Sequence, residues 1–187
     1  AQARACTQFN TIPASMLLLA LLVSVAIPWG AVGDVDVFRT ERVRSGLNMS
    51  KADGLWYEVA FHDVAQMGSS CQMLENRLDS QTGQVSQQFS VRYGVIPFSQ
   101  TYIYEPENSE RGVYTKYLDG AKGLLQLPTV IVDVTEGEDG MYSFMTEFSL
   151  KSLPLGEKLS VSELRFLSRL SEMSAERLQE MKDVAVS

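Results

Sequence analysis

The sequence has 187 residues, of which 45% are hydrophobic and 21% are charged, and its formal net charge at pH 7 is -7. A chain of this length can bury one sizeable core. The acidic balance, without a cluster of lysine and arginine, argues against nucleic acid as a partner and against electrostatic docking on anionic lipid.

Residues 12–33 contain no charged side chain and are mostly apolar, which is enough at about 1.5 Å per residue to cross a hydrocarbon core of roughly 30 Å. Arg4 precedes this segment and Asp34 follows it, so the charge bias places the tail of residues 1–11 on the cytoplasmic or stromal side. A cleaved export signal fits the same segment, with residues 31–33 as the cut site. We expect a retained single transmembrane helix, with the rest of the chain on the lumenal or exterior side, for instance in a thylakoid lumen.

Two cysteines, Cys6 and Cys71, flank the apolar segment. If that segment crosses a bilayer the two thiols lie on opposite sides, so we expect no intrachain disulfide. Residues 34–53 form a charged lead-in, which we predict to be irregular and to pack Leu47 and Met49 against the base of the domain that follows.

From residue 54 onward, short runs of β-branched and aromatic residues alternate with polar ones and are separated by turn residues, which is typical of strands. In the first run, residues 54–61, period-two alternation puts Trp56, Glu58 and Ala60 on one face. Seven further runs have the same character, at residues 70–79, 84–93, 98–105, 111–118, 128–135, 141–149 and 158–167.

Eight antiparallel strands joined mainly by short loops can close into a barrel that has no free edge and encloses room for one small ligand. After the last strand, Ser174 can cap a helix whose apolar stripe is Leu178, Met181 and Ala185. We therefore predict an all-β domain over residues 54–187, an eight-stranded up-and-down β-barrel with one C-terminal α-helix.

Residues 54–60, Gly-Leu-Trp-Tyr-Glu-Val-Ala, resemble the first signature of the lipocalin family, in the form typical of its apolipoprotein D and bacterial lipocalin branch. Residues 164–169 and 172–177 resemble the end of the eighth strand and the entry to the C-terminal helix. The middle signature is only half present, around Asp133. The resemblance implies that Gly54 opens the first strand and that Arg169 stacks on Trp56 at the barrel base, a contact worth about 0.5 to 2 kcal/mol.

Because lipocalins mostly bind small apolar molecules, the resemblance also implies a ligand inside the barrel. A bound lipid, carotenoid or chlorophyll would suit the site, and no cofactor is required. The same side chains could instead fill a barrel without a free cavity. The interior candidates are apolar or amphipathic, as in most ligand pockets, and comprise Ala60, Met73, Phe89, Val91, Tyr102, Tyr104, Tyr114 and Met145.

Catalytic and metal-binding patterns are scarce in the sequence. His62, the sole histidine, could ligate a chlorophyll magnesium or act as a base, but one histidine without clustered partners is usually a surface residue. Glu58 would be a buried acid and would need a partner, for which a hydrogen bond or salt bridge is the simplest solution. We predict no metal site and no enzyme activity. Since some lipocalin relatives are carotenoid de-epoxidases of plastids, an isomerase or de-epoxidase dependent on Glu58 or His62 stays as a third hypothesis.

Two other functions compete. The first is a membrane-anchored lipocalin-like protein that binds a small hydrophobic ligand, a lipid or a pigment, beside the bilayer. The alternative is a non-catalytic subunit of a larger membrane complex, such as a photosynthetic or respiratory supercomplex, in which the barrel contacts other subunits.

Overall fold

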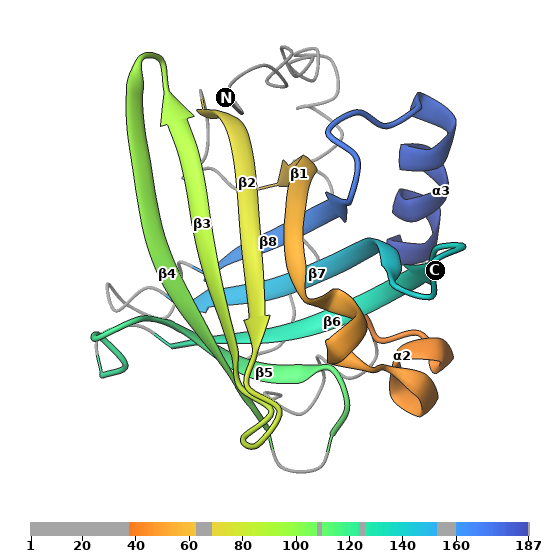
Figure 1. Ribbon diagram of the computed structural model, residues 1–187, viewed down its shortest axis with the longest axis horizontal. Helices are drawn as coiled ribbons and strands as arrows, with labels where there is room; N and C mark the ends of the chain where they lie inside the picture. Colours follow the sequence, from red (N-terminus) through yellow and green to blue (C-terminus); the bar gives the residue numbers. More distant parts are fainter. Residues whose placement is uncertain (1–37, 63–68, 108–109, 124–125, 153–159, 187) are drawn as a thin grey trace.

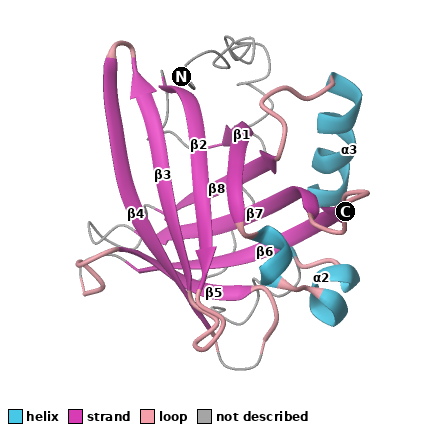
Figure 2. Ribbon diagram, viewed as in Figure 1, coloured by secondary structure: helices cyan, strands magenta, loops and turns pink. Residues whose placement is uncertain are grey.

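The computed structural model describes residues 38–62, 69–107, 110–123, 126–152 and 160–186, which form a closed β-barrel with helical segments beside it (Figure 1). Each strand pairs antiparallel with the next in the sequence, and β8 pairs with β1 to close the sheet. Figure 2 shows the strands curving around one interior. The strands are β1 Gly54–His62, β2 Ser69–Leu78, β3 Val85–Tyr93, β4 Ile96–Pro106, β5 Val113–Leu118, β6 Gln126–Glu136, β7 Tyr142–Ser152 and β8 Ser160–Ser168.

The lead-in differs from the predicted irregular segment, because it contains the α-helix α2 Glu41–Gly46 and the 3₁₀ helix η2 Met49–Ala52. Asn48 caps η2, accepting a hydrogen bond from the backbone N–H of Ser50 at 3.1 Å. Short helices form here because their apolar side chains reach the core: Val43 and Leu47 are buried, and Met49 packs against them.

The barrel has two different ends. The closed end is the one at which β1 begins and next to which η2 lies, and the open end is the one at which β1 and β3 finish and β2 and β4 begin. At the open end, the hairpin between β3 and β4 reaches the furthest in the view of Figure 1.

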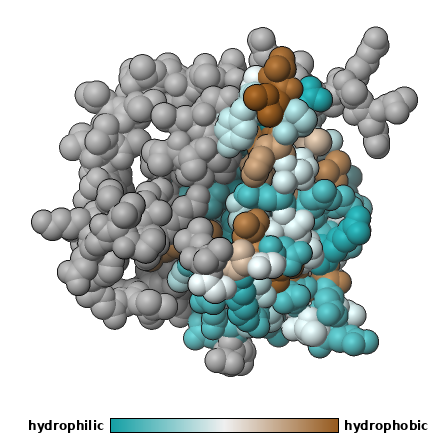
Figure 3. Space-filling model, turned by 90° about the vertical axis from the view of Figure 1, so that its left-hand side faces the viewer, coloured by the Kyte–Doolittle hydropathy of each residue, from teal (hydrophilic) through white to brown (hydrophobic). Residues whose placement is uncertain are grey.

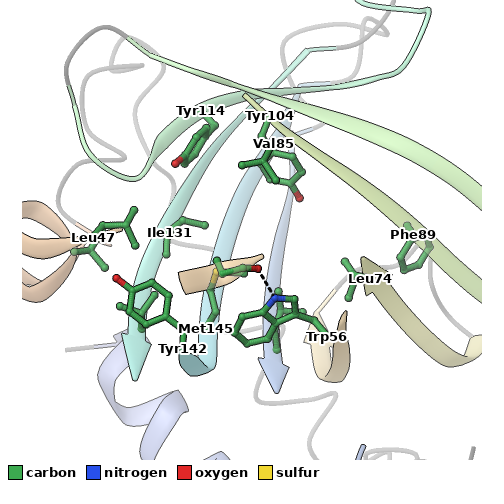
Figure 4. Packing of buried hydrophobic residues seen from close by; sticks show 14 of the residues in the cluster. Leu47, Trp56, Leu74, Val85, Phe89, Tyr104, Tyr114, Ile131, Tyr142 and Met145 are labelled. Carbon is green, nitrogen blue, oxygen red and sulfur yellow. Dashed lines mark hydrogen bonds between the residues drawn. The ribbon is translucent and has the colours of Figure 1, made fainter. Parts of the chain in front are cut away.

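Trp56 is fully buried at the closed end, where its Nε1 donates to the Ala52 carbonyl at 2.8 Å (Figure 4). The Arg169 guanidinium lies across the indole, with Cζ 4.0 Å from the ring centroid. The same guanidinium donates to backbone carbonyls of the lead-in, β1 and β7, those of Lys51, Asp53, Leu55 and Tyr142. Arg169, which follows the last strand, therefore ties the C-terminal part of the barrel to the lead-in and to the start of β1, around Trp56.

The last helix, α3 Ala175–Val186, lies on the outside of the barrel. Ser174 caps it, since its Oγ accepts from the Arg177 backbone N–H at 3.2 Å. Met181 is buried, and the Arg177 guanidinium lies 4.6 Å above the Phe144 ring of β7. The apolar stripe of the helix thus faces the sheet, as its period predicts.

Within the described ranges, none of the helices is both long and apolar enough to cross a membrane. The tail at 1–11 and the apolar segment at 12–33 lie outside the described residues. Cys71 is disulfide-bonded, which contradicts the expectation that the thiols are unpaired, and Cys6 lies outside the described residues. Cys71 also has a positive φ of 57°, at a register shift between β2 and β3.

Candidate functional site

A buried salt bridge between Glu58 of β1 and Arg165 of β8 lies inside the barrel. The guanidinium donates from Nε to Oε1 at 3.0 Å and from Nη2 to Oε2 at 3.1 Å. Both side chains are almost inaccessible, with 0% and 2% of their surface exposed. Bidentate geometry of this kind is among the stronger forms of charge-assisted hydrogen bonding.

Glu147 of β7 connects this pair to a second cation. Lys116 Nζ lies 3.1 Å from Glu147 Oε1, and Arg165 Nη1 lies 3.4 Å from the same oxygen. The Tyr104 hydroxyl lies 2.9 Å from Glu147 Oε1 and 2.9 Å from Gln87 Oε1. One carboxylate is therefore shared by partners from three other strands.

Glu163 of β8 completes the set, at 3.5 Å from Lys116 Nζ and 3.7 Å from Arg165 Nε. We call these five charged residues, Glu58, Lys116, Glu147, Glu163 and Arg165, the ionic cluster. All five are buried, so charged side chains occupy the middle of the barrel. Of these five, the sequence predicted only Glu58, as a buried acid that needs a partner, and its salt bridge with Arg165 confirms that prediction.

A chain of amides links the ionic cluster to the closed end. Arg165 Nη1 donates to Gln87 Oε1 at 3.2 Å, and Gln87 Nε2 donates to Asn76 Oδ1 at 3.0 Å. Asn76 Nδ2 lies 3.3 Å from the Ala52 carbonyl, which also accepts from Trp56. The cluster is thus continuous with the base.

Strand register brings the charges together. Glu147 and Arg165 are directly opposite each other in β7 and β8, as are Ser149 and Glu163. Lys116 is opposite Tyr104 in β4 and β5. Because residues opposite each other share a face of the sheet, all of these side chains point inward.

The ionic cluster contains three carboxyl groups against two cations, so one negative charge is in excess when all of them are ionised. Burial raises the pKa of the Glu58 carboxyl, although the charge of Arg165 acts in the opposite direction. Burial alone would lower the pKa of Lys116, but Glu147 and Glu163 outweigh it and raise that pKa. Glu58 is therefore the group at which a proton can balance the cluster.

Two tyrosines on the inner wall stay protonated over a wide pH range. Burial and the neighbouring Glu147 raise the pKa of Tyr104, while burial and Tyr142 raise the pKa of Tyr114 to about 12. Both hydroxyls therefore remain hydrogen-bond donors at neutral pH.

Six of the eight candidate interior residues lie inside the barrel, but the other two do not. Ala60 is opposite Phe166, which belongs to the outer face together with Thr146, because a register shift between Glu58 and Ala60 reverses the alternation of β1. Met73 is 39% exposed on the outside. The six inside are Phe89, Val91, Tyr102, Tyr104, Tyr114 and Met145.

Met73 lines a shallow outer hollow of about 130 Å³ across β1, β2 and β3. The sequence analysis predicted that this side chain lies inside the barrel. The register shift after Ser70, where Cys71 has a positive φ, reverses the faces. The inward residues of β2 are instead Gln72, Leu74 and Asn76, which are buried.

The sequence reading missed four members of the ionic cluster. Two signals were present: Lys116 lies two positions after Tyr114 and Glu147 two positions after Met145, both interior candidates, and period two puts each pair on one face. Arg165 and Glu163 gave no such signal, since β8 held no interior candidate. His62 is the last residue of β1, and its side chain lies outside the described part of the structure.

No group of three potential metal ligands occurs among the described residues. The chemistry on the inner wall is that of hydrogen bonding and charge.

Solved structures share this architecture. Lobster apocrustacyanin A1 matches with 14% sequence identity and a TM-score of 0.55, over 73% of this chain and 71% of that chain. Insecticyanin from the tobacco hornworm Manduca sexta matches with 13% identity and a TM-score of 0.56, over 74% and 71% of the two chains. The fold is lipocalin-like. At this identity the likeness concerns the fold alone. No protein-family model matches the sequence, and no curated protein matches it significantly.

Proposed function

We propose that this lipocalin-like barrel binds one small molecule that is mainly apolar and carries a polar group at one end. The apolar part lies in the half of the barrel near the open end, and the polar group faces the ionic cluster. The observation that supports this most directly is a change in character along part of the inner wall, from charged in the middle to mainly apolar above it.

That change is clearest along β3 and β4. From the closed end to the open end, the inward residues of β3 are Gln87, Phe89 and Val91, and those of β4 opposite them are Tyr102, Gln100 and Phe98. Phe89 and Tyr102 mark the boundary, because Arg165 Cζ lies 5.6 Å from the Phe89 ring centroid and Lys116 Nζ lies 5.0 Å from that of Tyr102.

The charge of the ionic cluster restricts the polar group. When all three carboxyl groups and both cations are ionised, the cluster carries one excess negative charge, so it repels an added anion and favours a group that donates hydrogen bonds, such as an alcohol, amide or amine. A ligand of this class would use the excess carboxylate without displacing a salt bridge.

The first experiment extracts the purified full chain with organic solvent and identifies lipids and pigments by mass spectrometry. We expect one compound at near-stoichiometric amount. The second titrates fluorescent long-chain probes that differ only in an alcohol, an amine or a carboxylate end, and we expect the carboxylate to bind the weakest.

A matched pair of variants locates the binding. Val91→Asp puts a charge on the inner wall and should weaken probe binding by more than about tenfold, whereas Met73→Asp puts the same charge on the outer surface and should leave binding unchanged. An empty extract together with equal probe binding by both variants would refute the proposal.

We further propose that the apolar segment at 12–33 inserts into a bilayer and holds the barrel beside it, on the lumenal or exterior side. Its length and lack of charge support this. The segment enters the bilayer without crossing it, because Cys71 is disulfide-bonded and Cys6 is the only other cysteine of the chain. Alkaline carbonate extraction of membranes tests it, because an integral anchor stays in the pellet and a peripheral protein is released.

One observation favours the alternative of a scaffold subunit. The five side chains of the ionic cluster fill the middle of the barrel and satisfy one another, which is how a barrel that serves as an interaction module could be stabilised without cargo. Co-purification of stoichiometric membrane subunits with an empty barrel would favour this function over the carrier.

A further inference from the structure

The hairpin between β3 and β4 exposes an unusual set of apolar side chains at the open end. Val95 is 94% exposed, Ile96 66% and Phe98 46%, and Tyr93 beside them is 38% exposed. Figure 3 shows the face that holds this hairpin, and hydrophobic residues gather at its upper edge. We call residues 93–98 the hairpin tip.

The hairpin also lacks the negative charge of the rest of the protein. Residues 80–104 contain no aspartate or glutamate, in a chain with 23 acidic residues, and Arg92 is the only charged residue among them. The hairpin tip contains Tyr93, follows Arg92 and has no carboxylate. This composition suits the interface of a lipid bilayer, because the tip can approach the headgroups without bringing an acidic side chain with it.

The course of the lead-in points to the same end of the barrel. Thr40 N donates to the Val132 carbonyl at 2.9 Å, and Arg42 Nη1 donates to the Val134 carbonyl at 2.6 Å. Phe38 stacks with Phe148 of β7 at 5.1 Å between ring centroids. Because β6 runs from the open end to the closed end, the described chain runs in that direction too.

Phe38, the first described residue, is therefore nearer to the open end than Thr40 and Arg42. Only residues 34–37 separate Phe38 from the apolar segment at 12–33. A bilayer that holds that segment would lie next to the open end, where the hairpin tip is.

We propose that the open end of the barrel rests on a lipid bilayer and that the hairpin tip inserts its apolar side chains into the interface. Tyr93, Ile96 and Phe98 share the inner face of the hairpin with Val91, because Tyr93 is opposite Ile96 and Val91 is opposite Phe98. The tip is thus continuous with the apolar part of the inner wall. If the proposed function holds, this surface is the path by which an apolar ligand passes between bilayer and barrel.

The test uses the full chain and a fluorescent label that responds to polarity. The label is attached at Val95→Cys in one variant and at Gln81→Cys in the other. Labelling is done without reductant, so that the disulfide of Cys71 stays closed, and the parent chain treated in the same way is the blank. Gln81 lies in the exposed turn between β2 and β3 at the closed end, so it is a matched control on the same barrel.

With phosphatidylcholine vesicles, we expect the emission of the label at position 95 to shift to the blue and most of its quenching by aqueous iodide to be lost. The label at position 81 should stay quenched. If the protein floats with the vesicles while both labels remain equally quenched, or if it does not float at all, the proposal is wrong.

A second pair of variants avoids any effect of the label. The double variant Val95→Asp, Ile96→Asp should reduce flotation with the vesicles. Where the apolar segment alone keeps the protein on the vesicles, the same variant should leave a label attached at Phe98→Cys open to quenching by iodide. Gln81→Asp with Thr82→Asp should do neither. Probe binding measured without vesicles reports on the ligand site separately, so failure of the docking surface and failure of the proposed function are distinguishable.

Discussion

Arg165 and Glu58 form a bidentate salt bridge inside the barrel although they are 107 positions apart in the sequence. The pair lies between β8 and β1, the two strands whose pairing closes the sheet. Removing either partner leaves a buried charge without compensation. The stability of variants at these two positions therefore shows how strongly the pair holds β1 and β8 together.

We predict that Arg165→Met destabilises the protein by roughly 3 to 5 kcal/mol, because Glu58 and Glu147 lose a cation in a site without solvent. Glu58→Leu should also destabilise it, since Arg165 loses its main partner. The double variant should be clearly more stable than the sum of the two losses implies. Urea denaturation of the three variants measures this coupling, and additive losses would show that the two side chains do not interact.

The Glu58 carboxyl makes stability depend on pH. Its pKa is raised in the folded state above the ordinary value of 4.5, chiefly by burial, so protonation favours the folded state. This contribution is complete below pH 4.5 and is lost as the pH rises through the folded-state pKa.

We therefore expect the free energy of unfolding of the parent protein to fall as the pH rises above 4.5, and Glu58→Gln to flatten that fall because its amide does not titrate. Denaturation curves across this range check it. Identical pH profiles for parent and variant would contradict the prediction.

Gly112 lies in the turn just before β5, next to Val43 of α2 and to Leu47. A Cβ at this position would lie 2.7 Å from Val43 Cγ1 and 3.2 Å from Leu47 Cδ2, and φ is +81°. Gly120 has a similar φ of +74° and open space around it. Gly112→Ala should therefore cost about 1 to 3 kcal/mol more than Gly120→Ala, because only the first adds a clash to the backbone strain. Equal losses in thermal denaturation would mean that α2 does not pack here.

Arg169 stabilises the closed end through the Trp56 ring and four backbone carbonyls. We expect Arg169→Ala to cost at least about 2 kcal/mol, and Arg169→Lys to recover only part of it, since an ammonium cannot reproduce the planar contacts. Arg77→Ala is the control: its ion pair with Glu75 is exposed and should change stability by less than about 0.5 kcal/mol. Calorimetry of the three variants measures their unfolding free energies, and equal losses for Arg169→Ala and Arg77→Ala would show that Arg169 does not stabilise the closed end.

Much of the fold could be read from the sequence because alternation and turn residues are local. The eight predicted runs, which begin near Gly54 and end near Leu167, match the eight strands. Ser174 was predicted to cap the last helix, and its Oγ accepts a hydrogen bond from the Arg177 backbone N–H at the start of α3. The lead-in was harder, since the helices α2 and η2 depend on burying Val43 and Leu47 against strands that come later in the chain.

The site was less predictable than the fold. Period two assigns faces correctly only while a strand is regular, and the register shifts after Glu58 and Ser70 moved Ala60 and Met73 to the outside. Neither shift has a glycine or proline to announce it.

The number of strands, the place of Trp56 at the barrel base and the final helix are all predictable from the sequence, because each depends on residues close together in the chain. The charged middle of the barrel arises only when the sheet closes. Lys116, Glu147 and Arg165 are ordinary strand residues until closure of the sheet buries all three and brings them within reach of one another and of Glu58 and Glu163.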